Sequence, residues 1–247
     1  QYKMEKFKDG KKKRPDMRKV NKIVSQAPVF EIDVTSTLTP ITELNTEHPA
    51  KEYLLNRRLP IEALYFTEKF QEWTNSVKPG TFEDVSQDEP RIIIPFKDKE
   101  GNTFGYQGRS IHNSGLRYIT ILLQEGQPKI FGLNTLDYDK TIYITEGPFD
   151  SLFVENCIAM AGADLSGVSN LGNNSVFIFD NEPRNKQISE RVRKLIDSGH
   201  SVVIWPSYIT QKDINDMFLA GIPVQNIIES NTYNGLKATL KFNEWRK

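Results

Sequence analysis

The second half of the chain alternates short strands with helices, and this pattern limits the fold more than any other feature. Runs of β-branched and aromatic residues predict its strands, at 141–145, 175–180 and 201–205. Helical spacing of apolar residues predicts the segments that follow them, at 148–157, 186–198, 213–220 and 224–229. Strands that are joined through helices pair in parallel, with right-handed crossovers. We therefore predict an α/β unit built on a parallel sheet that is flanked by helices.

Carboxylates follow each of these predicted strands. They are Glu146 and Asp150 after the first strand, Asp180 and Glu182 after the second, and Asp213 with Asp216 after the third. Because parallel strands end at one edge of the sheet, acids at successive strand ends converge in space. Like charges that converge are costly unless a cation neutralises them, and ligation by acids without His or Cys is typical of Mg²⁺ or Mn²⁺. The pattern predicts metal-assisted phosphoryl transfer.

Each acidic group also has a structural interpretation. Asp150 lies in the first turn of a predicted helix, where an acid complements the helix dipole, and Asp213 or Asp216 can cap the helix that begins there. Asp180 and Glu182, two positions apart, can face one side of an extended segment, although acid pairs are common at strand exits. Convergence at one sheet edge favours a metal site for the group, and leaves Asp213 open between capping and ligation.

The first half of the chain predicts a mixed α+β region. Apolar residues at helical spacing predict two short helices within 48–72, the second beginning at Pro60. The stretch 91–111 predicts a hairpin, with strand IIIPF, a turn at 98–102 and return strand TFGYQGRSI. We expect four parts, namely a basic arm or linker at 1–27, an α+β subdomain at 28–138, the parallel-sheet unit at 139–230 and a C-terminal helix at 231–247.

Charge is distributed unevenly along a chain whose net charge is zero. The first 22 residues hold ten Lys or Arg against three acids, a net charge of +7, which leaves an equal negative charge on the rest. A basic arm of this kind favours nucleic acid as a partner, with an affinity that falls as salt rises. A solvated linker is the alternative.

Composition excludes several classes of protein. The single cysteine, Cys157, excludes an internal disulfide and a cysteine-based zinc site, and its apolar surroundings predict a buried thiol at a helix end. No apolar run approaches the ~20 residues that span a bilayer, so we expect no membrane partner and a location in the cytoplasm, or in the host cytoplasm for a viral protein. Because the chain begins with Gln1, we expect a fragment of a longer protein.

The acidic motifs resemble the TOPRIM domain. Glu146, Gly147 and Asp150 match its Glu-Gly-x-x-Asp turn, while Asp180 and Glu182 match its Asp-x-Asp turn with Glu in place of the second Asp. This substitution keeps the carboxylate but lengthens the side chain by one methylene. The domain occurs in DnaG-type primases, in type IA and II topoisomerases and in OLD-family nucleases.

Motifs upstream and downstream resemble the catalytic core of bacterial and bacteriophage DnaG-type primases over about residues 45–220. The segments that carry this resemblance are EYLLNRRL, IIIPFKDKEGNTFGYQGRSI, LRYITIL, KIFGL and KDINDMF. By their positions in these motifs, Arg57, Arg109 and Arg117 stand for basic residues of the family, and Lys129 is a substitute for another.

The resemblance implies a DNA primase, which synthesises short RNA primers on single-stranded DNA from NTPs. It implies catalytic roles for Glu146, Asp180, Glu182 and Arg109. Metal ligation would fall to these three acids with Asp150 and Asp213, and phosphate binding to Arg57, Arg109, Arg117 and Lys129. It further implies a replicative helicase as partner and a zinc module upstream, with no zinc in this chain. A TOPRIM nuclease and a non-catalytic module that binds single-stranded DNA are the alternatives.

Overall fold

The computed structural model describes residues 33–112, 116–162, 168 and 174–247. The chain divides into two units, Gln1–Glu31 and Ile32–Lys247, and all described residues belong to the second. The basic arm predicted at 1–27 therefore lies outside the described residues. Within them, no helix is long and apolar enough to cross a membrane.

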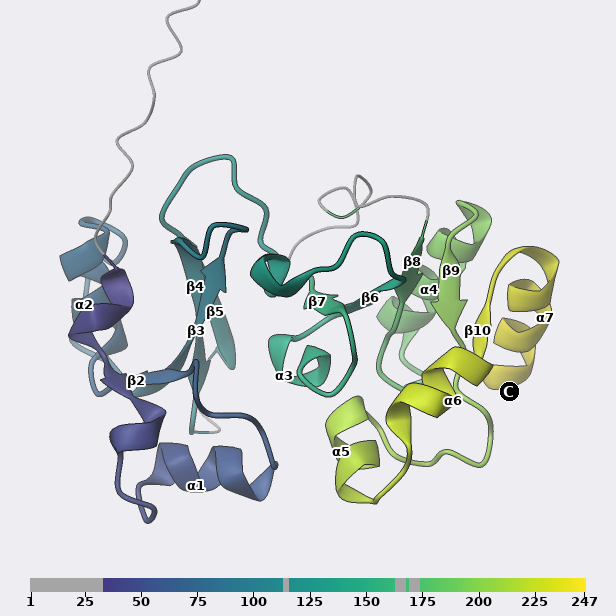
Figure 1. Ribbon diagram of the computed structural model, residues 1–247, viewed down its shortest axis with the longest axis horizontal. Helices are drawn as coiled ribbons and strands as arrows, with labels where there is room; N and C mark the ends of the chain where they lie inside the picture. The colour runs from purple at the N-terminus through teal and green to yellow at the C-terminus, as the bar shows by residue number, and fades with distance from the viewer. Residues whose placement is uncertain (1–32, 113–115, 163–167, 169–173) are drawn as a thin grey trace, which may run out of the picture. The chain divides into compact units, whose positions relative to one another are not determined.

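The first half of this unit is built on an antiparallel sheet with strands in sequential order (Figure 1). Its strands are β1 (Thr39–Pro40), β2 (Tyr65–Thr67), β3 (Arg91–Lys97), β4 (Thr103–Ser110) and β5 (Tyr118–Leu122). The predicted hairpin is confirmed, because β3 and β4 pair antiparallel from Arg91 opposite Ser110 to Lys97 opposite Thr103.

Helices α1 (Pro49–Asn56) and α2 (Phe70–Val77) cover opposite faces of this sheet. The second helix predicted from Pro60 is wrong, because this stretch is not helical and leads into β2, and α2 begins only at Phe70. Leu64 and Phe66 are buried against α1 and β3, and β2 hydrogen-bonds along β3. Sheet pairing outweighs the helical spacing of these apolar residues. Among its described residues this half also contains the short 3-10 helices Val34–Thr37, Ile41–Glu43 and Leu133–Thr135.

The second half contains a sheet whose strand order is β10-β9-β8-β6-β7. Its strands are β6 (Ile142–Thr145), β7 (Cys157–Ala159), β8 (Ser175–Phe177), β9 (Ser201–Val203) and β10 (Thr232–Tyr233). The pairs of β6 with β7, β6 with β8 and β8 with β9 are parallel, as predicted, whereas β10 adds an antiparallel edge.

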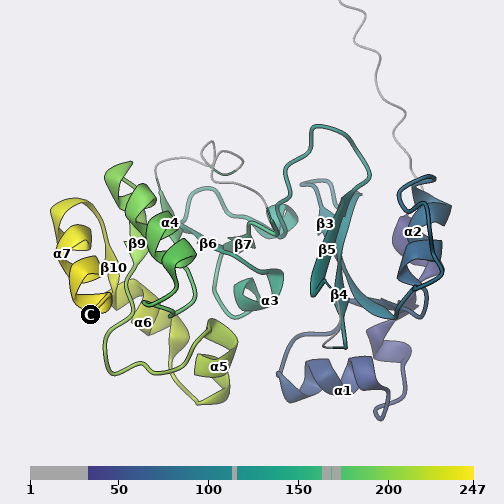
Figure 2. The ribbon, with the colours of Figure 1, turned by 180° about the vertical axis from the view of Figure 1, so that it is seen from behind.

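Side chains of this sheet alternate between two apolar clusters. Ile144 and Phe177 face α4 (Lys186–Asp197) and α7 (Gly235–Trp245). Tyr143 and Val176 face α5 (Ile214–Leu219) and α6 (Val224–Ser230). Figure 1 shows α6 nearer to the viewer than α4, and Figure 2, seen from behind, shows α4 in front. Helices therefore cover both faces, as expected of a parallel sheet.

The helix predicted at 148–157 is wrong in its second half. It is the short α3 (Pro148–Ser151), and Cys157 begins β7 instead of ending a helix. The Cys157 thiol is buried all the same, since it lies in the cluster of Tyr143 and Val176. The five-residue connection between α3 and β7 leaves room for an edge strand parallel to β6, and the apolar run at 157–160 satisfies that pairing.

Candidate active site

The site lies where the connections of two neighbouring parallel strands diverge. After β6 the chain enters α3 and the cluster shared with α5 and α6, where Val154 is buried. After β8 it enters α4, on the opposite face. Such a divergence opens a crevice at the carboxyl ends of the strands, which is the usual ligand site of open α/β sheets. Glu146 follows β6 and Asp180 follows β8 at this point.

A cavity of about 460 Å³ occupies this crevice. Its lining comes from both sheets: Arg57, Gln107, Arg109, Arg117, Tyr118, Thr120, Glu146, Gly147, Phe149, Asp150, Ala161, Gly162, Asp180, Lys212 and Asp213. The acids come from the ends of the parallel strands, whereas Gln107, Arg109, Tyr118 and Thr120 come from β4 and β5. One wall is therefore acidic and the facing wall is largely basic.

Most of the residues predicted from sequence meet in this cavity. Glu146, Asp150, Asp180, Asp213, Arg57, Arg109 and Arg117 line it. Glu182 and Lys129 are not among its lining residues. Asp213 also caps α5, where its side chain accepts a hydrogen bond of 2.8 Å from the N–H of Asp216, so the two interpretations left open for Asp213 are compatible.

Two acids are neutralised by cationic side chains. Arg191 of α4 forms an ion pair with Glu146, and Lys212 pairs with Glu182 at 3.4 Å. Arg191 was not predicted from sequence, because it lies on the exposed face of an amphipathic helix, where Arg is ordinarily solvated. The pair connects α4 to Glu146, which lines the cavity.

The remaining acids repel one another. Burial raises the pKa of Asp150 to about 7, and repulsion from Asp213 adds to this effect. Burial likewise raises the pKa of Asp180 to about 7, with further contributions from Asp150 and Glu146. The pKa of Glu146 is raised by burial, although Arg191 counteracts this. A cation bound among these buried carboxylates would offset their mutual repulsion and favour their ionised forms.

The donor atoms of this cavity fit a hard divalent cation. All candidate ligands are carboxylate oxygens, which Mg²⁺ and Mn²⁺ prefer, and their charges are only partly balanced. Yet in the part of the chain that the structure describes, no three His, Cys, Asp or Glu side chains are arranged as a ready metal-binding group. Binding would require Glu146 to exchange Arg191 for the cation and the acids to close around it.

Arg109 is held in a fixed direction on the facing wall. Its guanidinium lies 4.5 Å from the ring centroid of Tyr118 and 5.6 Å from that of Tyr53. It also donates a hydrogen bond of 2.9 Å to the Tyr53 hydroxyl. Cation–π contacts of this kind orient the planar group while leaving its charge available to an anion. Arg57, at the end of α1, lies 5.3 Å from the Tyr53 ring.

Hydrogen bonds connect the two walls, and the sequence contains no sign of them. The buried Asn215 of α5 donates its side-chain N–H to the carbonyl of Arg57 at 2.8 Å, and its backbone N–H to Asp150 at 3.3 Å. On the other side, Gln107 donates to the Thr120 hydroxyl at 3.0 Å, which donates to the Ala161 carbonyl at 3.0 Å. Asn215 thus contacts both an arginine and an acid of the predicted site.

Known proteins resemble this chain in sequence and in fold. No protein-family model matches the chain. It is 32% identical over 258 aligned residues to the DNA primase of Enterobacteria phage T4, an alignment that covers the whole of this chain and 74% of the phage protein.

Solved structures share its fold. The Aquifex aeolicus primase (zinc-binding and RNA polymerase domains) matches with a TM-score of 0.59 and 19% identity over 86% of this chain, and the chain spans 65% of that protein. The Escherichia coli primase catalytic core matches with a TM-score of 0.61 and 16% identity, covering 85% of this chain and 81% of the other.

The mixed α/β fold with its two sheets is that of solved primase catalytic cores. The similarity to the phage enzyme extends over the full length of the chain. The chain belongs to the DnaG-type DNA primase family.

Proposed function

We propose that this chain is the catalytic core of a DNA primase that synthesises short RNA primers on single-stranded DNA. The observation that carries the proposal is the cavity in which acids from parallel strand ends face arginines from an antiparallel sheet. One wall suits a metal ion and the other suits phosphates. The family relationship supports primer synthesis over the alternatives of a nuclease and a non-catalytic binding module.

In this proposal the parallel sheet and its helices form a TOPRIM domain at 139–230. A primase-like subdomain at 28–138 precedes it, with an arm at 1–27 that contacts nucleic acid. The segment 231–247 supplies α7 and also the edge strand β10. The proposed partners are the template, NTPs and a replicative helicase, and the proposed location is the cytoplasm, that of the host if the protein is viral.

The proposed reaction joins a primer 3′-oxygen to the α-phosphorus of an NTP and breaks the bond to pyrophosphate. Glu146, Asp180 and Glu182 would hold a divalent cation, with Asp150 and Asp213 orienting or completing the site. Such a cation, Mg²⁺ or Mn²⁺, would activate the attacking hydroxyl and would neutralise charge that develops on the phosphates.

The basic side chains would bind the anionic groups of both substrates. Arg109 is directed by its two tyrosines and presents a planar fork, which matches a phosphate with two parallel hydrogen bonds. Arg57 and Arg117, which line the same cavity, would bind the template backbone or the NTP phosphates. Lys129, which is exposed and does not line the cavity, would contact the nucleic acid outside it.

A primer-synthesis assay on single-stranded DNA with labelled NTPs and Mg²⁺ or Mn²⁺ tests this proposal. We expect short RNA products from the wild type. Glu146→Gln should lower their rate by more than about 100-fold, since even outer-shell partners of a metal are worth 10–100-fold. Cleavage of the DNA without synthesis would support a nuclease instead. A protein whose DNA binding and other activities are unchanged by Glu146→Gln would be a binding module.

A further inference from the structure

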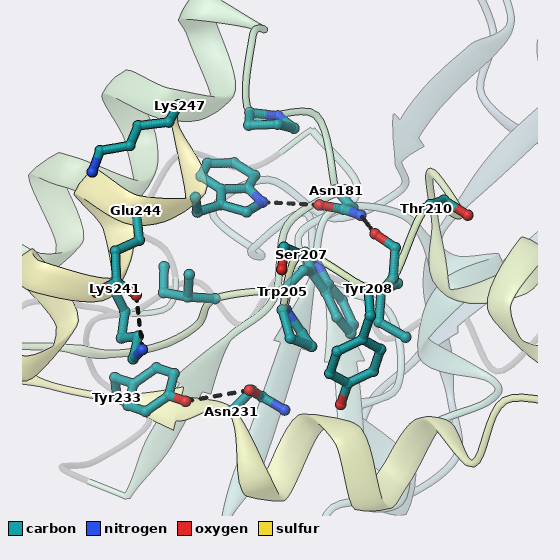
Figure 3. A pocket seen from close by; sticks show the side chains of 15 residues that line it. Asn181, Trp205, Ser207, Tyr208, Thr210, Asn231, Tyr233, Lys241, Glu244 and Lys247 are labelled. Carbon is teal, nitrogen blue, oxygen red and sulfur yellow. Dashed lines mark hydrogen bonds and ion pairs between the residues drawn. The ribbon is translucent and has the colours of Figure 1, made fainter.

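Asn181 lies between two of the proposed metal ligands, Asp180 and Glu182, and its backbone N–H and both ends of its side-chain amide form hydrogen bonds. Its backbone N–H donates to the Lys212 carbonyl at 2.6 Å. Its side-chain nitrogen donates to the carbonyls of Ile209 and Gln211 at 2.9 and 3.1 Å. Its side-chain oxygen accepts from the indole N–H of Trp245 at 2.8 Å (Figure 3).

The chemistry of the partners fixes the orientation of this amide. An indole nitrogen only donates, so it must face the Asn181 oxygen, and backbone carbonyls only accept, so they must face the nitrogen. The reversed amide would bring its oxygen against two carbonyl oxygens and its nitrogen against the indole N–H, which makes three repulsive contacts. Aspartate at this position would lose both side-chain donors and meet two carbonyl oxygens. The site is therefore specific for an amide.

These hydrogen bonds connect three segments that are distant in sequence. The loop 209–213 carries Lys212 and Asp213, both of which line the cavity, and Lys212 pairs with Glu182. Trp245 lies at the end of α7 and packs against the apolar clusters on both faces of the sheet. The hydrogen bonds of Asn181 thus connect the loop after β8 to the loop after β9, and connect both loops to the C-terminal helix α7.

We propose that Asn181 and Trp245 are positioning residues, which hold Asp180 and Glu182 at the separation from Lys212 and Asp213 that cation binding requires. This inference rests on the proposed metal role of the acids. It makes α7 a part of the active site, although none of its residues lines the cavity. Hydrogen bonds behind the ligands of a metal set their direction, and losing one typically weakens metal affinity 10–100-fold.

The variant Trp245→Phe removes the indole donor and keeps an aromatic ring. Trp73→Phe is the matched control, because Trp73 donates a hydrogen bond of 3.0 Å to Thr37 in the antiparallel-sheet half and does not line the cavity. Isothermal titration calorimetry of each protein with Mn²⁺ alone measures cation affinity without substrate. We expect about a 10-fold weaker affinity for Trp245→Phe, and no change for Trp73→Phe.

Primer synthesis as a function of metal concentration supplies a second readout. Excess Mn²⁺ should restore the rate of Trp245→Phe, because its defect is in affinity, and Asn181→Asp should show a larger defect in the same direction. Wild-type affinity in a folded Trp245→Phe, or an equal loss in Trp73→Phe, would overturn the inference. Failure of the metal site itself would appear differently, as a wild type that binds no Mn²⁺ or a Glu146→Gln variant that binds it equally well.

Discussion

At the scale of single residues, the buried acids of the cavity repel one another, and we expect a bound cation to relieve this repulsion. Asp150 and Asp180 both have pKa values raised to about 7, chiefly by burial and then by neighbouring acids. The ordinary pKa of aspartate is 3.8, so the folded protein binds more protons than the unfolded chain between these values. By linkage, the contribution of these groups to stability is fully present below about pH 4 and is lost as pH rises through about 7.

This sign predicts how stability depends on pH when divalent cations are absent. We expect the free energy of unfolding of the wild type, measured with urea in EDTA, to decline from pH 4 to pH 7 more steeply than that of the double variant Asp150→Asn/Asp180→Asn. Adding Mg²⁺ at pH 7 should stabilise the wild type and leave the double variant unchanged. Parallel pH profiles for the two proteins would contradict the prediction.

Arg109 offers a test of the opposite wall. Arg109→Ala should lower primer synthesis by about 100-fold, as loss of one transition-state donor does, and Arg109→Lys should recover only part of this, because Lys has no planar fork. The control is Arg58→Ala, since Arg58 is exposed and does not line the cavity. Steady-state kinetics with a primed template measures the effect, and equal losses in Arg109→Ala and Arg58→Ala would refute it.

At the scale of elements, Gly108, which precedes Arg109 in β4, lies so close to α2 that a larger side chain would not fit. A Cβ added at Gly108 would lie 2.4 Å from the ring of Phe70, at the start of α2. Gly147 differs from it, since a Cβ there would meet nothing nearer than Asp150 at 3.8 Å, and its φ of −117° is accessible to any residue. Glycine at 108 is required by packing, whereas the fold does not require glycine at 147.

These two glycines make a matched pair of predictions for stability. Gly108→Ala should lower the free energy of unfolding by about 1–3 kcal/mol, the usual cost of forcing atoms into a packed core. Gly147→Ala should change it by less than about 1 kcal/mol. Urea denaturation measures the free energy of unfolding of both variants. A Gly108→Ala variant as stable as the wild type would contradict the prediction, because it would show that the Phe70 ring can move aside at little cost.

Most elements were predictable because their patterns are local. The hairpin of β3 and β4 is indicated by an apolar strand, a polar turn and its return, and α4 by its amphipathic spacing and Gly199. The predictions fail where strand pairing determines the secondary structure. Residues 60–67 have helical spacing, but their last three residues form β2. Cys157 lies on an edge strand that pairs with β6.

The site was predictable for the same kind of reason and to the same limit. Strand ends converge at the edge of any parallel sheet. The sequence alone therefore predicts that Glu146 and Asp180, 34 positions apart, lie in the same site, and both line the cavity. Asn181 and Asn215 could not, because their partners lie 64 and 158 positions away and include backbone carbonyls, which leave no pattern in side chains.

At the scale of the whole molecule, the two walls of the cavity come from different sheets, and apolar and polar contacts among the described residues connect them. Phe149, which follows β6, packs in the apolar cluster of α1 and β3. Asn215 and the chain of Gln107, Thr120 and Ala161 add hydrogen bonds. A reaction that needs a metal on one wall and phosphate ligands on the other therefore depends on how accurately these contacts hold the sheets together.

Asn215 is the contact whose loss should reveal this dependence. Asn215→Leu keeps the volume but removes the hydrogen bond to the Arg57 carbonyl, which should cost about 1–3 kcal/mol of stability. Because Arg57 would no longer be held opposite Asp150, we expect KM for NTP to rise more than kcat falls.

The control for this variant is Asn75→Leu. Asn75 likewise bridges backbone groups, those of Phe82 at 2.8 and 2.9 Å, in α2 and outside the cavity. It should lose comparable stability and keep the wild-type KM. If both variants changed KM alike, the effect would come from general destabilisation. If Asn215→Leu left KM unchanged in a destabilised protein, the two walls would be aligned without Asn215, through Phe149 and Thr120.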